Sequence, residues 1–380
     1  MKILHLLSSI RPESGGPVTA VKDLSDNFTL TGDEITICTS SVPKTNIFNK
    51  SVNIVYISQS YTSYRLSLSL LIWLYQNVRF YDVVIVNGIW QFQSLAIYLI
   101  SHFYNVKYFI FPHGMLDPHL KELSFLKHFK KWIYWYCIES RVCKRAKNVI
   151  FTTQEEANLA KSGFFSDNIK YEIMKYGIKK PPQNQYYLRG MFFDKYSNLK
   201  GKTIILFMSR VHEKKGVNLL LDAFAQCCEN NPTLHLLIAG PGSKKYLDLL
   251  SNHSKKLGIS DHVTWLGMLS GQEKWSTYYA ADVFCLPSHQ ENFGIVVAEA
   301  LGCGIPVIIS NRVNICGVVQ ISGAGFVNKN TSEGTLQSLQ SWLELKESER
   351  NEMSKKAKSC FDENFDISYA AATLKNILTK

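Results

Sequence analysis

Short apolar runs alternate with helical patterns along almost the whole chain, and this alternation limits the fold more than any other feature. An apolar run of roughly four to eight residues between turn signals is typical of a buried strand. Strands that alternate with helices form parallel sheets covered on both faces by helices. The chain is therefore predicted to be an α/β protein, with strands at residues 2–8, 35–41, 53–57, 83–86, 107–111, 149–153, 171–175, 203–208, 235–239, 263–266, 283–286 and 307–310.

The length and one break in the pattern predict two domains. A chain of 380 residues exceeds the size of one ordinary hydrophobic core. Residues 179–185 contain a proline pair and polar side chains without periodicity, which is typical of a linker. We predict two Rossmann-like domains, residues 1–180 and 181–364, with the carboxyl ends of both sheets lining one deep cleft.

Residues 288–306 hold two carboxylates, Glu291 in a turn and Glu299 inside an apolar helix. If the helix begins near Gly294, Glu299 lies about 7 to 8 Å along its axis. Glu291 would then precede the helix N-terminus, where unpaired N–H groups and the helix dipole favour an anion such as a phosphate. An anion site between two carboxylates that accept hydroxyl hydrogen bonds fits a ribose–diphosphate–sugar.

The spacing of these residues resembles a family signature. A Glu, seven residues and a second Glu, with Phe-Gly after the first and Gly-x-Pro after the second, resembles the retaining GT-B glycosyltransferases of family 4. Asn292 stands where Gly is commoner, and Asn also tolerates turn conformations. The resemblance covers nearly the whole chain, more strongly its second half. It implies a GT-B architecture whose last helix, about residues 365–380, packs on the first domain.

Two cations follow the first expected strand of the second domain. Arg210 and Lys215 lie just before a glycine, and Arg by its planar fork and Lys as a point charge can bind a diphosphate. The alternative is a pair of solvated charges. The spacing resembles the family's Arg-x4-Lys-Gly pattern, with Ser209 where Gly is commoner. By the same resemblance, further residues of this domain would contact the donor, namely Gly240, Met268, Leu269, Asn292, Phe293, Gly294 and Ile295.

The first domain offers a glycine pair and a histidine. Gly15 and Gly16 follow the first expected strand, and adjacent glycines let backbone amides approach a phosphate. Taken alone the pair favours a plain surface loop, but it resembles the family's glycine-rich loop near the donor diphosphate and the acceptor. His113 follows a later strand, where it can donate to a sugar hydroxyl or take up a proton near neutral pH. A lone His is usually structural, but the Pro-His-Gly context resembles the family's acceptor side.

The net charge of the chain does not determine which kind of partner it binds. A net charge of +11 is compatible with nucleic acid, anionic lipid or phosphorylated small molecules, but no nucleic-acid module is recognisable. Between residues 121 and 147, eight basic residues accompany two acidic ones. This segment would contact a membrane through Trp132 and Trp135. The favoured alternative is a helix packed on the first domain through Leu126, Phe129, Ile133 and Tyr136.

Two further patterns bear on compartment and metal. Scattered cysteines fit a reducing cytoplasm, and no apolar run approaches the roughly 18 residues of a membrane span. We expect a cytoplasmic protein and leave peripheral contact with the inner face of a membrane open. No Asp-x-Asp occurs, whereas metal-dependent nucleotide-sugar enzymes commonly present two nearby carboxylates to Mg²⁺ or Mn²⁺. The site is therefore predicted to need no metal and no cofactor.

Together these features predict a hexosyltransferase. Arg210 and Lys215 would stabilise the leaving nucleoside diphosphate, while Glu299 holds the ribose, Glu291 the sugar hydroxyls, and His113 the sugar or the developing oxocarbenium ion. The resemblance implies retention of configuration. The expected donor is UDP-glucose or a related UDP-hexose, then GDP-mannose, and the acceptor a saccharide or lipid-linked saccharide in polysaccharide or glycoconjugate biosynthesis. The alternatives are a UDP-N-acetyl-sugar 2-epimerase of the same architecture and a non-catalytic sugar-nucleotide-binding subunit.

Overall fold

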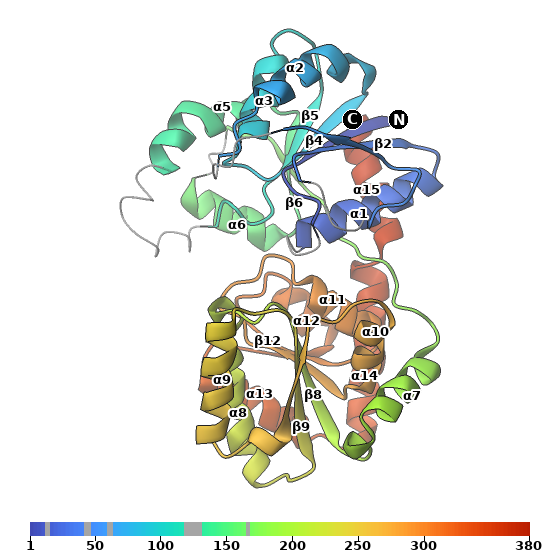
Figure 1. Ribbon diagram of the computed structural model, residues 1–380, viewed down its shortest axis with the longest axis vertical. Coiled ribbons are helices and arrows are strands. Elements are labelled where there is room, and N and C mark those ends of the chain that lie inside the picture. The colour runs from blue at the N-terminus through green and yellow to red at the C-terminus, as the bar shows by residue number, and fades with distance from the viewer. Residues whose placement is uncertain (12–15, 42–46, 59–63, 118–130, 165–167) are drawn as a thin grey trace. The chain divides into compact units, whose positions relative to one another are not determined.

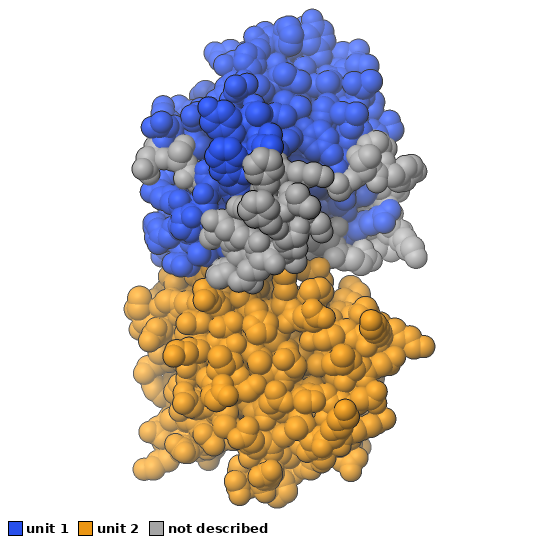
Figure 2. Space-filling view, turned by 90° about the vertical axis from the view of Figure 1, so that its left-hand side faces the viewer, with its two compact units in different colours: residues 1–177, 367–380 blue, residues 178–366 orange. Residues whose placement is uncertain are grey.

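The chain forms two compact units, each built around one parallel sheet. The computed structural model describes residues 1–11, 16–41, 47–58, 64–117, 131–164 and 168–380. Unit 1 contains residues 1–177 and 367–380, and unit 2 contains residues 178–366 (Figures 1 and 2). These bounds lie within three residues of the domain ends expected from the sequence.

Unit 1 is a seven-stranded parallel sheet in the order β3-β2-β1-β4-β5-β6-β7. Its central strands are buried on both faces, which explains why they read as unbroken apolar runs rather than as alternating patterns. The strands are β1 Lys2–Leu7, β2 Glu34–Thr39, β3 Asn53–Tyr56, β4 Val83–Asn87, β5 Tyr108–Phe111, β6 Asn148–Phe151 and β7 Tyr171–Ile173. The helices are α1 Gly16–Leu30, α2 Leu68–Asn77, η2 Val78–Phe80, α3 Phe92–Ile100, η4 Trp135–Glu139, α5 Ser140–Arg145, α6 Gln154–Gly163 and α15 Ile367–Thr379.

Unit 2 is a six-stranded parallel sheet in the order β10-β9-β8-β11-β12-β13. The strands are β8 Thr203–Met208, β9 Leu234–Ala239, β10 Val263–Gly267, β11 Val283–Leu286, β12 Val307–Ser310 and β13 Gly325–Asn328. The helices are α7 Gln185–Lys195, η5 Ser197–Leu199, η6 Glu213–Lys215, α8 Val217–Glu229, α9 Lys244–Lys256, η7 Ser260–His262, α10 Gly271–Ala280, α11 Ile295–Gly302, α12 Cys316–Ser322, α13 Ser332–Leu343 and α14 Glu347–Asn364.

Every strand expected from the sequence is present, and no end differs by more than two residues. One strand, β13, was not expected. It offers only two apolar side chains, Phe326 and Val327, and it pairs with β12 through its backbone, with Gly325 opposite Val307. A Cβ on Gly325 would lie 1.9 Å from the Val307 carbonyl oxygen, so this contact depends on tertiary packing that no local pattern reports.

Two surfaces of unit 1 differ from the sequence interpretation. Trp135 is buried, so it does not face a membrane, whereas Trp132 is exposed. Ile133 and Tyr136 are also exposed, so the expectation that they pack on the first domain is wrong. Leu126 and Phe129 lie outside the described residues. Among those described, no helix is both long and apolar enough to cross a membrane.

The two ends of the chain meet at Asp33 in unit 1. Helix α15 packs beside α1 (Figure 1), and Asp33 accepts hydrogen bonds of 2.7 Å from Lys375 Nζ and from the N-terminal ammonium. Burial raises the pKa of Asp33, but these hydrogen bonds outweigh it and hold the pKa below its ordinary value. The ion pairs therefore fasten the C-terminal helix to unit 1.

Replacing Asp33 by Asn should weaken this attachment. Two ammonium groups would then face a neutral amide, and we expect the free energy of unfolding of unit 1 at pH 7 to fall by roughly 1–3 kcal/mol, the range for hydrogen bonds to charged groups. Because the folded pKa is lowered, the carboxylate contributes fully above about pH 4 and loses its contribution as the pH falls through the folded value.

Urea unfolding of wild type and variant at pH 7 and at low pH measures this difference. The matched control is Glu34→Gln, which removes the adjacent carboxylate, an exposed group 3.3 Å from Lys2. An exposed pair of this kind is worth about 0–1 kcal/mol. Equal losses in both variants would show that Asp33 has no special role.

Candidate functional site

In unit 2 the strand order reverses between β8 and β11, and in open α/β sheets ligands commonly bind near such a reversal. The loops after these two strands are joined through their backbones, since the N–H of His289 donates to the carbonyl of Lys214 at 2.8 Å. Gly216 has a φ of 69°, and a Cβ there would lie 2.2 Å from the carbonyl oxygen of Pro287. Only glycine permits this approach.

The same contact brings together two predicted site residues. Lys215 Nζ forms an ion pair with Glu291 Oε2, and the Lys215 side chain is almost buried. Glu291 is fixed from the other side, because its N–H donates to the carbonyl of Arg312 at 3.0 Å and its carbonyl accepts from the N–H of Asn314 at 3.1 Å. The junction of the two loops therefore holds a neutralised ammonium–carboxylate pair.

Arg210 stands at the carboxyl end of β8 and is exposed. Among the described residues its guanidinium has no ion-pair partner. Ser209, just before it, donates its N–H to the carbonyl of Ala239 at 3.0 Å. Gly240 has a φ of 136°, and a Cβ there would lie 1.8 Å from the Ser209 carbonyl oxygen. Packing of the loops after β8 and β9 thus accounts for this glycine, and its predicted contact with the donor stays a prediction.

Glu299 lies inside α11 and is 4% exposed. Its carboxylate forms an ion pair with Lys274 Nζ and accepts a hydrogen bond of 2.9 Å from the hydroxyl of Tyr278. Both partners belong to α10 and were missed in the sequence. Their spacing, four positions apart in an expected helix, places them on one helix face, which is the only signal that could have indicated them.

The remaining predicted residues of unit 2 lie around this centre. Asn292 accepts a hydrogen bond of 3.2 Å from Asn314 Nδ2, and Phe293 packs edge to face on Phe365 at 5.6 Å, so both side chains hold the loop in place. Gly294, with a φ of 79°, caps α11, and Ile295 begins that helix. Met268 and Leu269 follow β10, with β9 between their strand and β8; Met268 is exposed and Leu269 half-buried.

In unit 1, His113 follows β5 in a left-handed conformation with a φ of 51°. Its ring stacks on Phe111 at 5.6 Å, and its Nε2 lies 3.3 Å from Asn87 Oδ1. Burial lowers the pKa of His113 to about 4. The lowered pKa favours an uncharged ring at neutral pH and so, of its two predicted roles, the hydrogen bond to a sugar hydroxyl, which stays a prediction; the residue as a whole is half-buried. Gly16 begins α1 and is exposed, and Gly15 lies outside the described residues.

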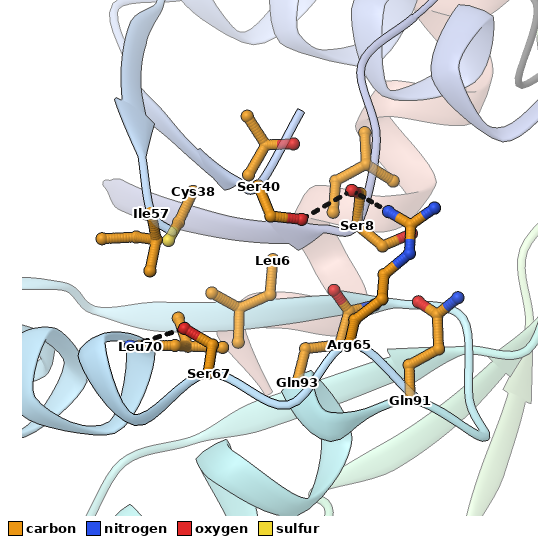
Figure 3. A pocket seen from close by; sticks show the side chains of 12 residues that line it. Leu6, Ser8, Cys38, Ser40, Ile57, Arg65, Ser67, Leu70, Gln91 and Gln93 are labelled. Atoms are coloured by element: carbon orange, nitrogen blue, oxygen red, sulfur yellow. Dashed lines mark hydrogen bonds between the residues drawn. The ribbon is translucent and has the colours of Figure 1, made fainter. Parts of the chain in front are cut away.

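A small pocket of about 30 Å³ opens at the carboxyl ends of β1, β2 and β3 in unit 1 (Figure 3). Leu6, Cys38, Ile57 and Leu70 provide apolar walls, and Ser8, Ser40, Arg65, Gln91 and Gln93 provide polar groups. Figure 3 shows Arg65 reaching toward Ser8, whose carbonyl accepts a hydrogen bond from the guanidinium. Gln93 Nε2 donates a hydrogen bond of 2.8 Å to the carbonyl of Asn87, whose side chain contacts His113. This hydrogen bond links the pocket wall to the surroundings of His113.

Two family models match the chain and together cover both units. A model described as Glycosyl transferases group 1 matches residues 191–359, and one described as Glycosyltransferase Family 4 matches residues 14–178. Among curated relatives, the D-inositol 3-phosphate glycosyltransferase of Mycolicibacterium smegmatis is 31% identical over 176 residues, which are 45% of this chain and 39% of that protein. The phosphatidyl-myo-inositol mannosyltransferase of Mycobacterium leprae is 37% identical over 113 residues, 29% of each chain. The matched segments thus span about two fifths or less of these relatives.

Solved structures resemble the chain over its whole length. HepE from Anabaena, in complex with UDP and glucose, has a TM-score of 0.79 at 17% identity and covers 100% of both chains. WaaG, described as a glycosyltransferase involved in lipopolysaccharide biosynthesis, has a TM-score of 0.75 at 16% identity and covers 99% of both. These likenesses confirm the predicted fold class, two parallel-sheet α/β domains of the GT-B type.

The buried pair of Glu299 and Lys274 generates a stability prediction. Lys274→Met leaves the carboxylate of Glu299 buried without a counter-charge, and we expect the free energy of unfolding of unit 2 to fall by roughly 3 kcal/mol. Adding Glu299→Gln removes that charge and should recover part of the loss. Denaturant unfolding of the single and double variants measures both effects.

Lys195→Met serves as the matched control. Lys195 pairs at 2.7 Å with Glu273, the residue before Lys274, but both of these side chains are more than half exposed. Exposed pairs of this kind contribute about 0–1 kcal/mol. A loss for Lys274→Met no larger than that of the control would show that the Glu299 carboxylate does not need its partner.

Proposed function

Because the chain belongs to the group 1 glycosyltransferases of family 4, we propose that it transfers a hexose from a nucleotide sugar to a saccharide or lipid-linked saccharide, with retention of configuration. The observation that carries the proposal is the pairing at the strand reversal of unit 2, where Lys215 meets Glu291 and Lys274 meets Glu299. The two carboxylates of these pairs and the exposed cation Arg210 would together meet the needs of a ribose–diphosphate–sugar.

In this proposal the cations stabilise the leaving group. The C1–O bond to the diphosphate breaks while the acceptor hydroxyl attacks the same face, and its proton passes to the departing phosphate. Arg210 and Lys215 neutralise the charge that develops on the diphosphate, which is usually the largest catalytic contribution. No metal is required for this step. Glu299 accepts from the ribose hydroxyls, Glu291 from hydroxyls of the sugar, and His113 contacts the sugar from unit 1.

The preferred donor is UDP-glucose or a related UDP-hexose, with GDP-mannose second. The UDP and glucose named for HepE support the first, and the mannosyltransferase among the curated relatives supports the second. The pocket of Figure 3 is the proposed subsite for one small group of the acceptor. Its Arg65, near the charge of Arg11, favours an acceptor that carries a phosphate, and the curated relatives are named for inositol phosphate and phosphatidylinositol.

Unit 1 is also the proposed contact with an anionic membrane, on the cytoplasmic side. Of the net charge of +11, unit 1 carries +8, from 21 Lys and Arg less 13 Asp and Glu in residues 1–177 and 367–380. Helix α2 exposes Leu68, Ile72 and Tyr75, which lie on one face at helical spacing. An apolar helix face on a cationic unit suits an anionic lipid surface.

Incubation with UDP-glucose and with GDP-mannose tests the proposed reaction. We expect slow hydrolysis of one donor without an acceptor and transfer when a lipid-linked or phosphorylated saccharide is added, both unchanged by EDTA because the diphosphate is neutralised by side chains. Conversion of a UDP-N-acetyl sugar to its 2-epimer would favour the epimerase. Binding of the donor without turnover in any mixture would favour the non-catalytic subunit. Loss of activity in EDTA with recovery in Mn²⁺ would overturn the metal-free mechanism.

The two carboxylates should separate nucleotide binding from catalysis. Glu299→Gln removes the charge that strengthens hydrogen bonds from the ribose, and we expect UDP to bind about 1–2 kcal/mol more weakly. Glu291→Gln should not weaken the binding of UDP, because it frees Lys215 from its carboxylate partner. It should lower kcat more than it raises KM, since its contacts matter most as the sugar gains positive charge.

Calorimetry with UDP beside turnover of the intact donor measures both variants. The control for folding is the thermal transition of each. If Glu291→Gln weakens the binding of UDP as much as Glu299→Gln does, the two carboxylates do not bind separate parts of the donor.

A further inference from the structure

His113 is held in an unfavourable backbone conformation. It and Gly114 adopt successive positive φ angles of 51° and 76°, and a non-glycine residue in this region is strained unless its surroundings fix it. The carboxylate of Glu156 provides that restraint. It is 3% exposed; its Oε1 accepts the N–H of Gly114 at 2.6 Å, and its Oε2 accepts the N–H and hydroxyl of Thr152 at 2.8 and 2.7 Å.

The side chain of His113 is held separately by Asn87, the last residue of β4. Asn87 Nδ2 lies 3.3 Å from the carbonyl oxygen of Leu6 and 3.4 Å from that of Ile85. Both are acceptors, so they require the NH₂ group on this side of the amide. Turning the amide over would place its oxygen against two carbonyl oxygens. The contact with His5 Nδ1 at 3.3 Å does not decide the orientation, because His5 can donate or accept there.

This orientation fixes the proton on His113. Asn87 Oδ1, an acceptor only, faces His113 Nε2 at 3.3 Å, so Nε2 must carry the hydrogen and Nδ1 must carry the lone pair. Among the described residues Nδ1 has no hydrogen-bond partner. It can therefore accept from a hydroxyl, but it cannot donate to a phosphate or a carboxylate.

We propose that Asn87 and Glu156 are positioning residues that hold His113 with its proton on Nε2, so that Nδ1 accepts a hydrogen bond from a hydroxyl of the bound sugar. The identity of that ligand rests on the proposed function; the position of the proton does not. In this assignment His113 accepts a hydrogen bond from a sugar hydroxyl, whereas the cations in unit 2 bind the diphosphate.

Long-range ¹H–¹⁵N NMR of the full chain labelled in histidine tests the proton assignment without any donor. At pH 7.5, the His113 signals, identified by their loss in His113→Gln, should show a protonated Nε2 and an unprotonated Nδ1. Asn87→Leu removes the acceptor and should change this signature, whereas Asn87→Asp keeps an oxygen facing Nε2 and should preserve a protonated Nε2. A wild-type His113 with its proton on Nδ1 would overturn the proposal.

Kinetics test whether the two residues act through His113. Asn87→Leu and Glu156→Gln should each lower kcat about tenfold, the value of one hydrogen bond, with the Kd of UDP unchanged within about twofold. The matched control is Glu155→Gln, an exposed carboxylate in the same turn of α6, which should leave kcat unchanged. In a His113→Ala background, Asn87→Leu should not lower kcat any further. If Asn87 had a merely structural role, its replacement would lower kcat in this background as well.

Donors that each lack one hydroxyl test the ligand of Nδ1. One such analogue of UDP-glucose should react about tenfold more slowly with wild type and no more slowly than the parent donor with His113→Ala. If no analogue behaves in this way, Nδ1 does not accept from the sugar. If no donor reacts but the NMR signature is found, the proposed function fails while the proton assignment stands. If a donor reacts and the NMR signature is absent, the proton assignment fails while the proposed function stands.

Discussion

The approach of Gly216 to the carbonyl of Pro287 is the constraint on which the site in unit 2 depends. Parallel strands bring the ends of β8 and β11 to one edge of the sheet, but they do not bring the following loops into contact. That contact requires a residue without a Cβ in a left-handed conformation, because a Cβ at position 216 would lie 2.2 Å from the carbonyl oxygen of Pro287. With the backbones in place, Lys215 reaches Glu291 from a position 76 residues away. Geometry at a glycine thus determines where a charge pair lies.

The pairing of charges has a physical consequence for any ligand. A buried carboxylate costs free energy unless it is paired and hydrogen-bonded, and Glu299 meets that condition through Lys274 and Tyr278. Each carboxylate oxygen still has capacity to accept another hydrogen bond. Glu299 therefore keeps acceptor capacity beyond its two partners, whereas a diphosphate at Lys215 would compete with Glu291 for the ammonium. In the proposed function, Glu299 thus offers acceptors to hydroxyls, and Lys215 exchanges Glu291 for a phosphate.

The sequence predicted the fold well because buried parallel strands are recorded locally, as apolar runs between turn residues. It predicted Glu291 and Lys215 as site residues from a family pattern, but not that they pair with each other. The sequence did not identify four residues whose importance comes from tertiary contacts, namely Lys274, Tyr278, Asn87 and Glu156. Their partners lie between four and several dozen residues away in the sequence. The sequence also left two roles open for His113, because the pKa of the ring depends on its surroundings, and these are set by the folded unit.

Both units use the same strand order around their reversal points, yet they place different chemistry there. In unit 2, β11 follows β8 in the sheet and its loop carries Glu291 beside Lys215. In unit 1, β4 occupies the corresponding position beside β1, and it ends in Asn87 between His5 and His113. Burial lowers the pKa of His5 to about 3 and that of His113 to about 4, so both rings are uncharged at neutral pH. A cluster of neutral donors and acceptors suits hydroxyl groups, whereas paired ions beside an exposed Arg210 suit a diphosphate. The same topology therefore carries groups that suit hydroxyls in unit 1 and groups that suit a diphosphate in unit 2.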